Sequence, residues 1–209
     1  FDPIRRQVEA ELGAPLDKLF LHFDANPLAA GSIAQVHQAV TREGEPVVVK
    51  VRRPNIVQTI RVECEIIEDL AGLLKSSMSP AETIDPVRMA QEFTEAVNKE
   101  VDLANEERNL RRFGRNFRDD PTVHIPRTYP QYSTASVLTM ERIDGIKCSN
   151  IPALEAAGLD RKVIAERGAR FILRQVFEFR FFHADPHPGN IFVLADNVIA
   201  PVDFGQVAR

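Results

Sequence analysis

The first quarter of the chain carries its hydrophobic residues in short runs that are typical of β-strands. LFLHF, AQVHQAV and PVVVKV, between residues 19 and 51, are short and rich in branched and aromatic side chains. NPLAAGS is expected to form a loop between the first two runs, and REGE the turn of a hairpin between the next two. We therefore predict a small antiparallel sheet, preceded by a short helix over residues 1–12 that ends near Gly13.

Residues 56–117 show the longer spacing of amphipathic helices. In residues 56–75 the apolar side chains recur near helical spacing, at Ile56, Ile60, Cys64, Ile67, Leu70 and Leu74. After an expected loop at residues 76–86, Asp85 can cap a second, longer helix that has Pro86 at its first position. We predict that this helix runs without interruption from about Val87 to Phe117.

The second half of the chain returns to strands and then to a helix. HIPRTYPQYS and ASVLTMERI are expected to form two strands, and a third long helix is expected over residues 160–181. IFVLADNVIAPVDFG then predicts a short hairpin that turns at Asp196 and Asn197. This order is that of an α+β protein with the bilobal protein-kinase fold. Residues 1–147 would form an N-lobe with an antiparallel sheet and added helices, and residues 148–209 the truncated start of a helical C-lobe.

Composition and charge indicate which kinds of binding partner and cellular compartment the protein is suited to. Of the 209 residues, 44% are hydrophobic and 27% charged, as in an ordinary soluble globular protein. The net charge of −4 is spread along the chain, so nothing favours nucleic acid or an anionic membrane surface as a partner. Cys64 and Cys148 lack CxxC spacing, which fits a reducing compartment. No apolar run approaches 18 residues, so these residues are not expected to cross a membrane, and the start at Phe1 leads us to expect a fragment of a longer protein.

HADPHPGN, at residues 183–190, and the later DFG carry the residue types of a magnesium and phosphate site. Asp185 and Asn190 stand five positions apart, the interval of the kinase catalytic loop H-R-D-x-x-x-x-N. Asp185 can accept a hydroxyl proton or orient the acceptor, and the amide oxygen of Asn190 can bind a metal ion. Asp203 follows Asn190 by one short hairpin, which is expected to bring both oxygen ligands to one metal.

Lys50 lies in the third strand on the same side as Val48, so its charge needs a partner inside the fold. The segment KEVDLANEERN offers several acids, of which Asp102 and Glu106 fall on one face of a continuous helix. An edge-strand lysine and a solvated acidic face are the ordinary interpretations of such residues. The position downstream of a lysine strand favours an orienting glutamate instead. We predict Glu106 as the partner of Lys50, with Glu107 as the second choice.

His183 and His187 also permit a zinc interpretation, but no third ligand follows at a usual spacing. We favour a structural role for His183, bracing the loop through backbone hydrogen bonds. A second unusual feature lies between the first two strands, where a protein kinase would carry G-x-G-x-x-G and this chain has PLAAGSIAQVHQA. Gly31 is the only glycine there, and alanine methyl groups limit how closely a backbone can fold over phosphates. Altered nucleotide handling is therefore expected.

Five segments together resemble the successive motifs of one family. AAGSIAQVH, VVVKVRRP, EVDLANEERN, HADPHPGN and DFG, between about Pro27 and Gly205, are similar to those of the UbiB-type atypical kinases, also called ADCK, aarF-domain or ABC-one kinase-like proteins. The resemblance implies a protein-kinase-like fold that binds ATP with Mg²⁺. It also implies a link to ubiquinone or other prenyl-quinone metabolism, commonly at membranes. ATP hydrolysis or action on lipid-like small molecules is better supported for the family than protein phosphorylation.

The resemblance also implies roles for single positions. The catalytic residues would be Asp185, Lys50 and Glu106, and the metal ligands Asn190 and Asp203. An alanine-rich loop would take the place of the glycine-rich one, with Ala29, Ala30, Gly31, Ser32, Ile33 and Ala34, beside Lys50, at the nucleotide. Glu100 and Asp102 match the family's E-x-D element.

The family's K-x-G-Q segment and everything after DFGQVAR are absent from these residues, so we do not expect them to form a fully active enzyme alone. The whole protein is expected to be cytoplasmic and peripheral to, or anchored at, a membrane through other segments. Its expected partners are a prenyl-quinone or similar lipid-like molecule and a lipid-biosynthesis protein complex. Two alternatives stay open: a non-catalytic ATP-binding scaffold, which has no chemical need for Asp185, and an aminoglycoside- or choline-type phosphotransferase. The alanine-rich loop and the extra helix at residues 56–75 argue against the latter.

Overall fold

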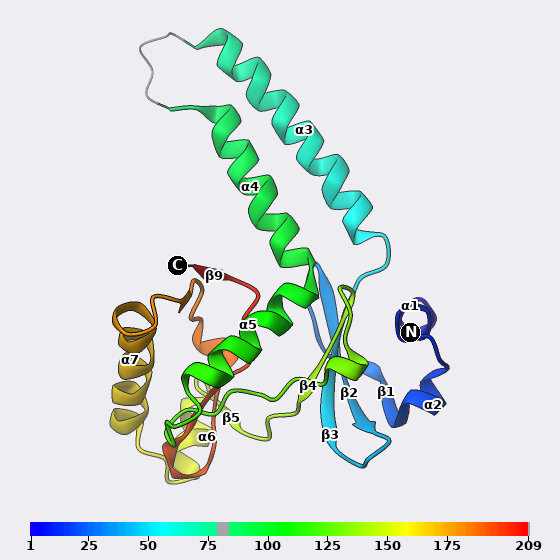
Figure 1. Cartoon of the computed structure of the whole chain (residues 1–209). Coiled ribbons are helices and arrows are strands. Elements are labelled where there is room, and N and C mark those ends of the chain that lie inside the picture. Colours follow the sequence, from blue (N-terminus) through cyan, green and yellow to red (C-terminus); the bar gives the residue numbers. More distant parts are fainter. Residues whose placement is uncertain (79–83, 209) are drawn as a thin grey trace.

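A four-stranded antiparallel sheet forms one side of the computed structural model, which describes residues 1–78 and 84–208 (Figure 1). In spatial order its strands are β1 (Phe20–Ala30), β2 (Ala34–Thr41), β3 (Pro46–Arg52) and β4 (Val137–Glu141). Alternate valines of β3, namely Val47, Val49 and Val51, pack with helices α1 (Asp2–Leu12) and α2 (Leu16–Leu19), whereas Val48 joins a core on the other side. The predicted sheet and N-terminal helix are confirmed.

The first strand is longer than its sequence pattern indicates. The pattern predicts a loop over NPLAAGS, but β1 continues through Ala30 and the turn to β2 is confined to residues 31–33. Pro27 pairs with His37 and Ala29 with Val36, with register shifts on both sides of the proline. Such irregularities let a strand accommodate a residue that has no N–H to donate.

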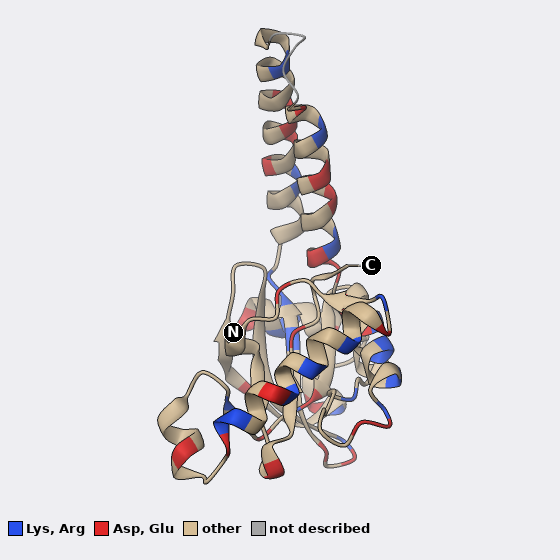
Figure 2. Ribbon diagram, turned by 90° about the vertical axis from the view of Figure 1, so that its left-hand side faces the viewer, with Lys and Arg blue, Asp and Glu red and all other residues tan. Residues whose placement is uncertain are grey.

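Helices α3 (Ile56–Ser77) and α4 (Pro86–Val101) form an antiparallel hairpin that projects from the rest of the molecule, with charges of both signs along its length (Figures 1 and 2). Ile60, Cys64 and Val101 are buried together near its base. Asp85 accepts hydrogen bonds from two N–H groups of the first turn of α4, as predicted. The middle of the expected loop at residues 76–86, residues 79–83, lies outside the described residues.

The single helix predicted over residues 87–117 is wrong, because the chain breaks at Asp102 into α4 and α5 (Leu103–Asn116). Asp102 has a ψ of 96°, and its carboxylate accepts a hydrogen bond from the Ala104 N–H at 3.0 Å, so it caps α5. The Leu103 N–H donates to the Ala135 carbonyl at 3.0 Å, and the Arg52 guanidinium donates to the same carbonyl at 3.2 Å. These bonds to the sheet hold the break in place, and the apolar pattern along the helix gives no sign of them.

The connections around β4 also differ in part from the expected elements. ASVLTMERI contains β4, but HIPRTYPQYS forms no named strand. It holds the 3₁₀ turn η1 (Pro130–Tyr132) and one isolated bridge, from Thr128 to Met140. Pro126 and Pro130 lack the N–H groups that a ladder needs. A short helix that the pattern did not predict, α6 (Ile151–Ala156), is capped by Asn150, and the third long helix, α7 (Arg161–Phe177), ends earlier than expected.

The second core joins α5 to the C-terminal part of the chain. There β5 (Ile146–Lys147), β7 (Ile191–Val193) and β8 (Ile199–Pro201) form one small sheet, and β6 (Phe182–His183) pairs with β9 (Val207–Ala208). Two further 3₁₀ turns, η2 (Pro188–Asn190) and η3 (Ala195–Asn197), flank β7. The predicted turn is confirmed, with left-handed φ values of 55° at Asp196 and 59° at Asn197. Since this core also contains Val48 and Leu138 of the first sheet, packing is continuous across residue 147, and a lobe boundary at that position stays a prediction.

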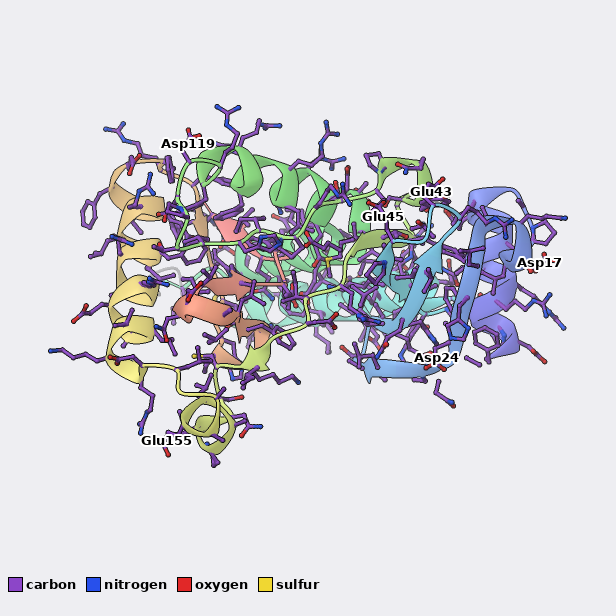
Figure 3. The ribbon with its side chains drawn as sticks, turned by 90° about the horizontal axis from the view of Figure 1, so that it is seen from below. Asp17, Asp24, Glu43, Glu45, Asp119 and Glu155 are labelled. Carbon is purple, nitrogen blue, oxygen red and sulfur yellow. The ribbon has the colours of Figure 1, made fainter. Side chains whose placement is uncertain are left out.

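Most acidic side chains lie on the outside of the molecule. Of those labelled in Figure 3, Asp17, Glu43, Asp119 and Glu155 are exposed, and Asp24 and Glu45 are half-buried. Glu106, by contrast, belongs to the buried polar residues. None of the helices within the described ranges combines the length and apolar character needed to cross a membrane.

Candidate functional site

Lys50 on β3 and Glu106 on α5 meet in the interior of the fold. Lys50 Nζ donates a hydrogen bond to Glu106 Oε2 at 2.7 Å, and Asp203 Oδ1 lies 3.8 Å from the same nitrogen. The Glu106 side chain is 3% exposed and that of Lys50 is 19% exposed. The predicted pairing is confirmed. Glu107, the second choice, accepts a hydrogen bond from Thr128 instead.

Burial and neighbouring charges together shift the pKa values of Glu106, Lys50 and Asp203. Burial raises the pKa of the Glu106 carboxyl, against the opposing effect of the Lys50 ammonium. Burial acts to lower the pKa of Lys50, but the carboxylates of Glu106 and Asp203 outweigh it and the pKa is raised. Burial likewise acts to raise the pKa of Asp203, but Lys50 and the N–H of Gly205 bring it below its ordinary value. At neutral pH an ammonium and the Asp203 carboxylate therefore face each other.

Asn190 and Asp203 are brought together by the β7–β8 hairpin. Asn190 directly precedes β7 and Asp203 follows β8, and antiparallel pairing of Ile191 with Pro201 places both at one end of the hairpin. Asn190 Nδ2 lies 3.5 Å from Asp203 Oδ2. Mg²⁺ in phosphate sites is held by one or two protein oxygens together with phosphate oxygens and waters, so this amide and carboxylate fit such an ion.

The loop that carries Asp185 is braced by its two histidines. His183 Nδ1 accepts a hydrogen bond from the Asp185 N–H at 3.1 Å, and the His183 N–H donates to Gln175 Oε1 at 2.8 Å. His187 Nδ1 accepts one from the Gly189 N–H at 3.0 Å. The bracing role predicted for His183 is confirmed. Over residues 1–78 and 84–208, no three His, Cys, Asp or Glu side chains are grouped to hold a metal ion.

Two adjoining cavities bring these residues to a common space. The larger one, of about 620 Å³, lies between the first sheet and the β5–β7 pair, within the range of about 300–1,000 Å³ typical of small-molecule sites. Its apolar wall includes Val36, Val48, Met140, Phe192 and Val202. A smaller recess of about 90 Å³ is lined by Asp185, Glu106 and His183. Lys50, Asn190 and Asp203 line both, so apolar walls lead to a charged end.

The alanine-rich segment forms one wall of the larger cavity, which every residue from 29 to 34 lines. The Gly31 N–H donates to the Ala34 carbonyl at 2.9 Å. Arg53, just beyond β3, donates from Nε to the Gly31 carbonyl at 2.9 Å and from its N–H to the Ile33 carbonyl at 2.8 Å. A β-carbon at Gly31 would meet the Ala34 oxygen at 3.6 Å, an ordinary contact. The segment is therefore a tied turn that does not require glycine, unlike a mobile glycine-rich loop.

The whole chain, residues 1–209, matches the family model described as the ABC1 atypical kinase-like domain. The chain belongs to this family. The resemblance drawn from the five motifs is thereby confirmed, and the ABC1 match also covers the N-terminal helices that precede the first motif.

Curated relatives of this ABC1 domain include bacterial and plant proteins. It is 42% identical over 204 residues to "Probable protein kinase UbiB" of Marinobacter nauticus, a match that covers 96% of this chain and 37% of that protein. It is 40% identical over 205 residues to "Protein ACTIVITY OF BC1 COMPLEX KINASE 7, chloroplastic" of Arabidopsis thaliana, covering 98% and 29%. The chain thus spans about a third of the length of these curated relatives.

Solved structures show the same fold. The Rv3197–erythromycin complex from Mycobacterium tuberculosis aligns with a TM-score of 0.82 at 27% identity, over 99% of this chain and 51% of its own. The Rio2 kinase–ADP/Mg²⁺–phosphoaspartate complex from Chaetomium thermophilum aligns with a TM-score of 0.53 at 13% identity, over 98% and 52%. The latter likeness shows the fold alone. The ABC1 domain has the kinase-like α+β fold that the sequence predicts.

The two acids of the E-x-D element have different surroundings in the ABC1 domain. Glu100, in the last turn of α4, lines both cavities and accepts a hydrogen bond from Gln206 Nε2 at 3.4 Å. Asp102 is the cap of α5. The expectation that Asp102 and Glu106 share a face of one continuous helix is therefore wrong, because Asp102 stands before the helix that carries Glu106.

Sequence reasoning missed three parts of the site. Gln206 lines the smaller recess, residues 140–144 line the larger cavity, and the Asn109 side chain donates to the Phe204 carbonyl at 2.9 Å. Each lies inside or directly beside a segment that was recognised. Gln206 follows DFG directly, and residues 140–144 comprise the end of the predicted strand ASVLTMERI and the residue after it. Asn109 is the last residue of EVDLANEERN, one helical turn after Glu106. Their closeness to recognised segments is the one feature of the sequence that could have identified these residues as part of the site.

Proposed function

We propose that this ABC1 domain binds ATP with Mg²⁺ in the cavity beside Lys50 and catalyses hydrolysis or transfer of the terminal phosphoryl group. One observation carries the proposal. Lys50, Asn190 and Asp203, from distant segments, line the same cavity, and Asp185 lines the recess that adjoins it. Phosphoryl transfer requires positioning and charge neutralisation more than covalent chemistry from the protein, and these residues supply both.

Each residue has a separate part in the proposed reaction. Lys50, oriented by Glu106, donates hydrogen bonds to phosphate oxygens. Asn190 and Asp203 would hold Mg²⁺, which when bound neutralises phosphate charge. Asp185 takes the proton of the attacking water or hydroxyl group as its oxygen bonds to the terminal phosphorus and the bond to the ADP oxygen breaks.

We extend the proposal to the setting of the whole protein. A prenyl-quinone or another lipid-like molecule is the proposed acceptor or ligand, and the protein would act beside lipid-biosynthesis proteins at the cytoplasmic face of a membrane. The motif resemblance and the relatives named UbiB support this setting. Contact with the membrane would be made by segments outside these residues.

A substitution at Asp185 distinguishes a catalytic function from that of a non-catalytic ATP-binding scaffold. In the full-length protein, we expect Asp185→Asn to retain ATP binding and to lower phosphate release or transfer about 10²–10⁴-fold, because the proton acceptor is lost. Radiolabelled ATP, with lipid extract and amino alcohols as acceptors, measures both outcomes. Asp196→Asn is the matched control, since a left-handed φ of 55° in an exposed turn accepts asparagine. Unchanged turnover in Asp185→Asn would favour the scaffold, and phosphorylated amino alcohols would favour a small-molecule phosphotransferase.

A further inference from the structure

The peptide groups around Phe204 are held by α5 on both sides. The Phe204 N–H donates to Glu106 Oε1 at 3.4 Å, and its carbonyl accepts a hydrogen bond from Asn109 Nδ2 at 2.9 Å. Glu106 and Asn109 are three positions apart, so they project from the same face of the helix. The fully buried Phe204 ring lies 4.6 Å, between centroids, from the ring of Phe113, a further turn along α5. Helix α5 therefore fixes both the backbone and the side chain of Phe204.

The peptide group between Phe204 and Gly205 links Asn109 to the carboxylate of Asp203, the proposed metal ligand. The carbonyl of Phe204 and the N–H of Gly205 belong to one planar trans unit, so they point in opposite directions. On one side Asn109 holds the carbonyl, and on the other side the Gly205 N–H donates to Asp203 Oδ1 at 3.1 Å. Turning this peptide plane would withdraw the N–H from the Asp203 carboxylate.

Asn109 does not line either cavity, so a ligand in them would not touch it. We propose that Asn109 is a positioning residue that, through the Phe204–Gly205 peptide, fixes the Asp203 carboxylate in the orientation that receives Mg²⁺. This inference rests on the proposed function, in that Mg²⁺ is the ion Asp203 would hold. It adds a second task to α5, which with Glu106 already orients Lys50.

Asn109→Asp in the full-length protein tests the inference with little change of shape. The aspartate cannot donate to the Phe204 carbonyl, and the loss of one such bond corresponds to about a tenfold change in an equilibrium constant. We expect Mg²⁺-dependent ATP binding, measured by calorimetry, to weaken about tenfold, while ATP binding without Mg²⁺ stays as in the wild type. Asn105→Asp is the matched control, because it makes the same change one turn earlier, where the amide donates to the Lys99 carbonyl. We expect the control to leave both affinities unchanged.

Hydrogen exchange provides a readout that needs neither metal nor nucleotide. In peptic fragments containing residues 204–206, we expect the amides to exchange about tenfold faster in Asn109→Asp than in the wild type or in Asn105→Asp. Asn109→Ala carries the same test should the aspartate variant fail to fold. Wild-type exchange and wild-type Mg–ATP affinity in the Asn109 variants would overturn the inference. A wild-type protein that shows no Mg²⁺-dependent ATP binding would overturn the proposed function instead, and the exchange rates would still decide whether Asn109 holds the peptide.

Discussion

Helices α4 and α5 follow each other directly in the chain and lie in opposite environments. α4 is half of the projecting hairpin, and its ion pairs Arg88–Glu92 and Lys99–Glu95 join side chains that are between 65% and 77% exposed (Figures 1 and 2). α5 packs into the core, where Glu106 is 3% exposed and bonded to Lys50. The same residue types therefore make ion pairs of different consequence on the two helices.

The difference lies in what each pair connects. An exposed pair one turn apart supports its own helix by about 0.3–0.5 kcal/mol. Removal of one partner from a buried pair leaves a charge without compensation and costs about 3–5 kcal/mol. The Lys50–Glu106 pair also joins a strand to a helix and points a lysine into the cavity, so burial couples stability to the site. Asp102 lies at the junction of the exposed helix α4 and the buried helix α5, as the C-cap of the first and the N-cap of the second.

The largest loss of stability is expected from Glu106→Gln, which breaks the buried ion pair between Lys50 and Glu106. Lys50 keeps its charge and retains the Asp203 carboxylate 3.8 Å away, so we expect a loss of unfolding free energy near 3 kcal/mol, at the low end for a broken buried pair. Weaker ATP binding should accompany it. Denaturant unfolding and calorimetry of the full-length protein measure the two quantities.

Glu107→Gln is the matched control for this change. It lies one position further along α5, and it pairs with Arg111 at 3.8 Å. The Glu107 side chain is 14% exposed and that of Arg111 is 55% exposed, so this pair reaches solvent on one side. We expect a change within about 1 kcal/mol and wild-type ATP affinity. Equal losses in the two variants would mean that burial does not distinguish the pairs.

A smaller effect is expected at the boundary between the helices. Asp102→Ala removes the cap of α5, which costs about 1 kcal/mol of unfolding free energy, and it loosens the turn that carries Glu106, so ATP affinity should fall slightly. Asp85→Ala removes the corresponding cap of α4, at the far end of the hairpin, and should leave ATP affinity unchanged. Calorimetric titration of both variants compares them. The same loss of affinity in both would show that the hairpin and α5 act as one unit.

The smallest effect is expected on the hairpin surface. Arg88→Ala breaks an exposed pair with Glu92, and we expect the unfolding free energy to change by no more than about 0.5 kcal/mol. Thermal melting of the full-length protein is the measurement. A fall as large as that of Glu106→Gln would contradict the contrast drawn between the two helices.

Local signals in the sequence located most of the elements. The cap at Asp85, the stop at Gly13 and the turn at Asp196 depend on neighbouring residues, and all three are present in the structure. The break at Asp102 was missed because it depends on the Ala135 carbonyl and on Arg52, both far away in the sequence. The spacing of apolar residues along a helix carries no information about hydrogen bonds to residues that are distant in the sequence.

The site followed a similar rule. The order of kinase motifs led to the partner of Lys50, although 56 positions separate it from Glu106. The motifs contain Asn109, Phe204 and Glu100, but they do not say that Asn109 bonds to Phe204, 95 positions away, or that Glu100 bonds to Gln206, 106 positions away. These contacts arise from the way α4 and α5 pack against the C-terminal segment, which the sequence pattern does not specify.

The proposal that Lys50, Asn190 and Asp203 form one Mg–nucleotide site is best tested by titrating the full-length protein with ATP in the presence and absence of Mg²⁺. We expect Mg²⁺ to strengthen ATP binding by the wild type, and Asp203→Asn, folded as judged by melting, to lose that strengthening. An Asp203→Asn protein that binds ATP with the Mg²⁺ dependence of the wild type would contradict the assignment of the site.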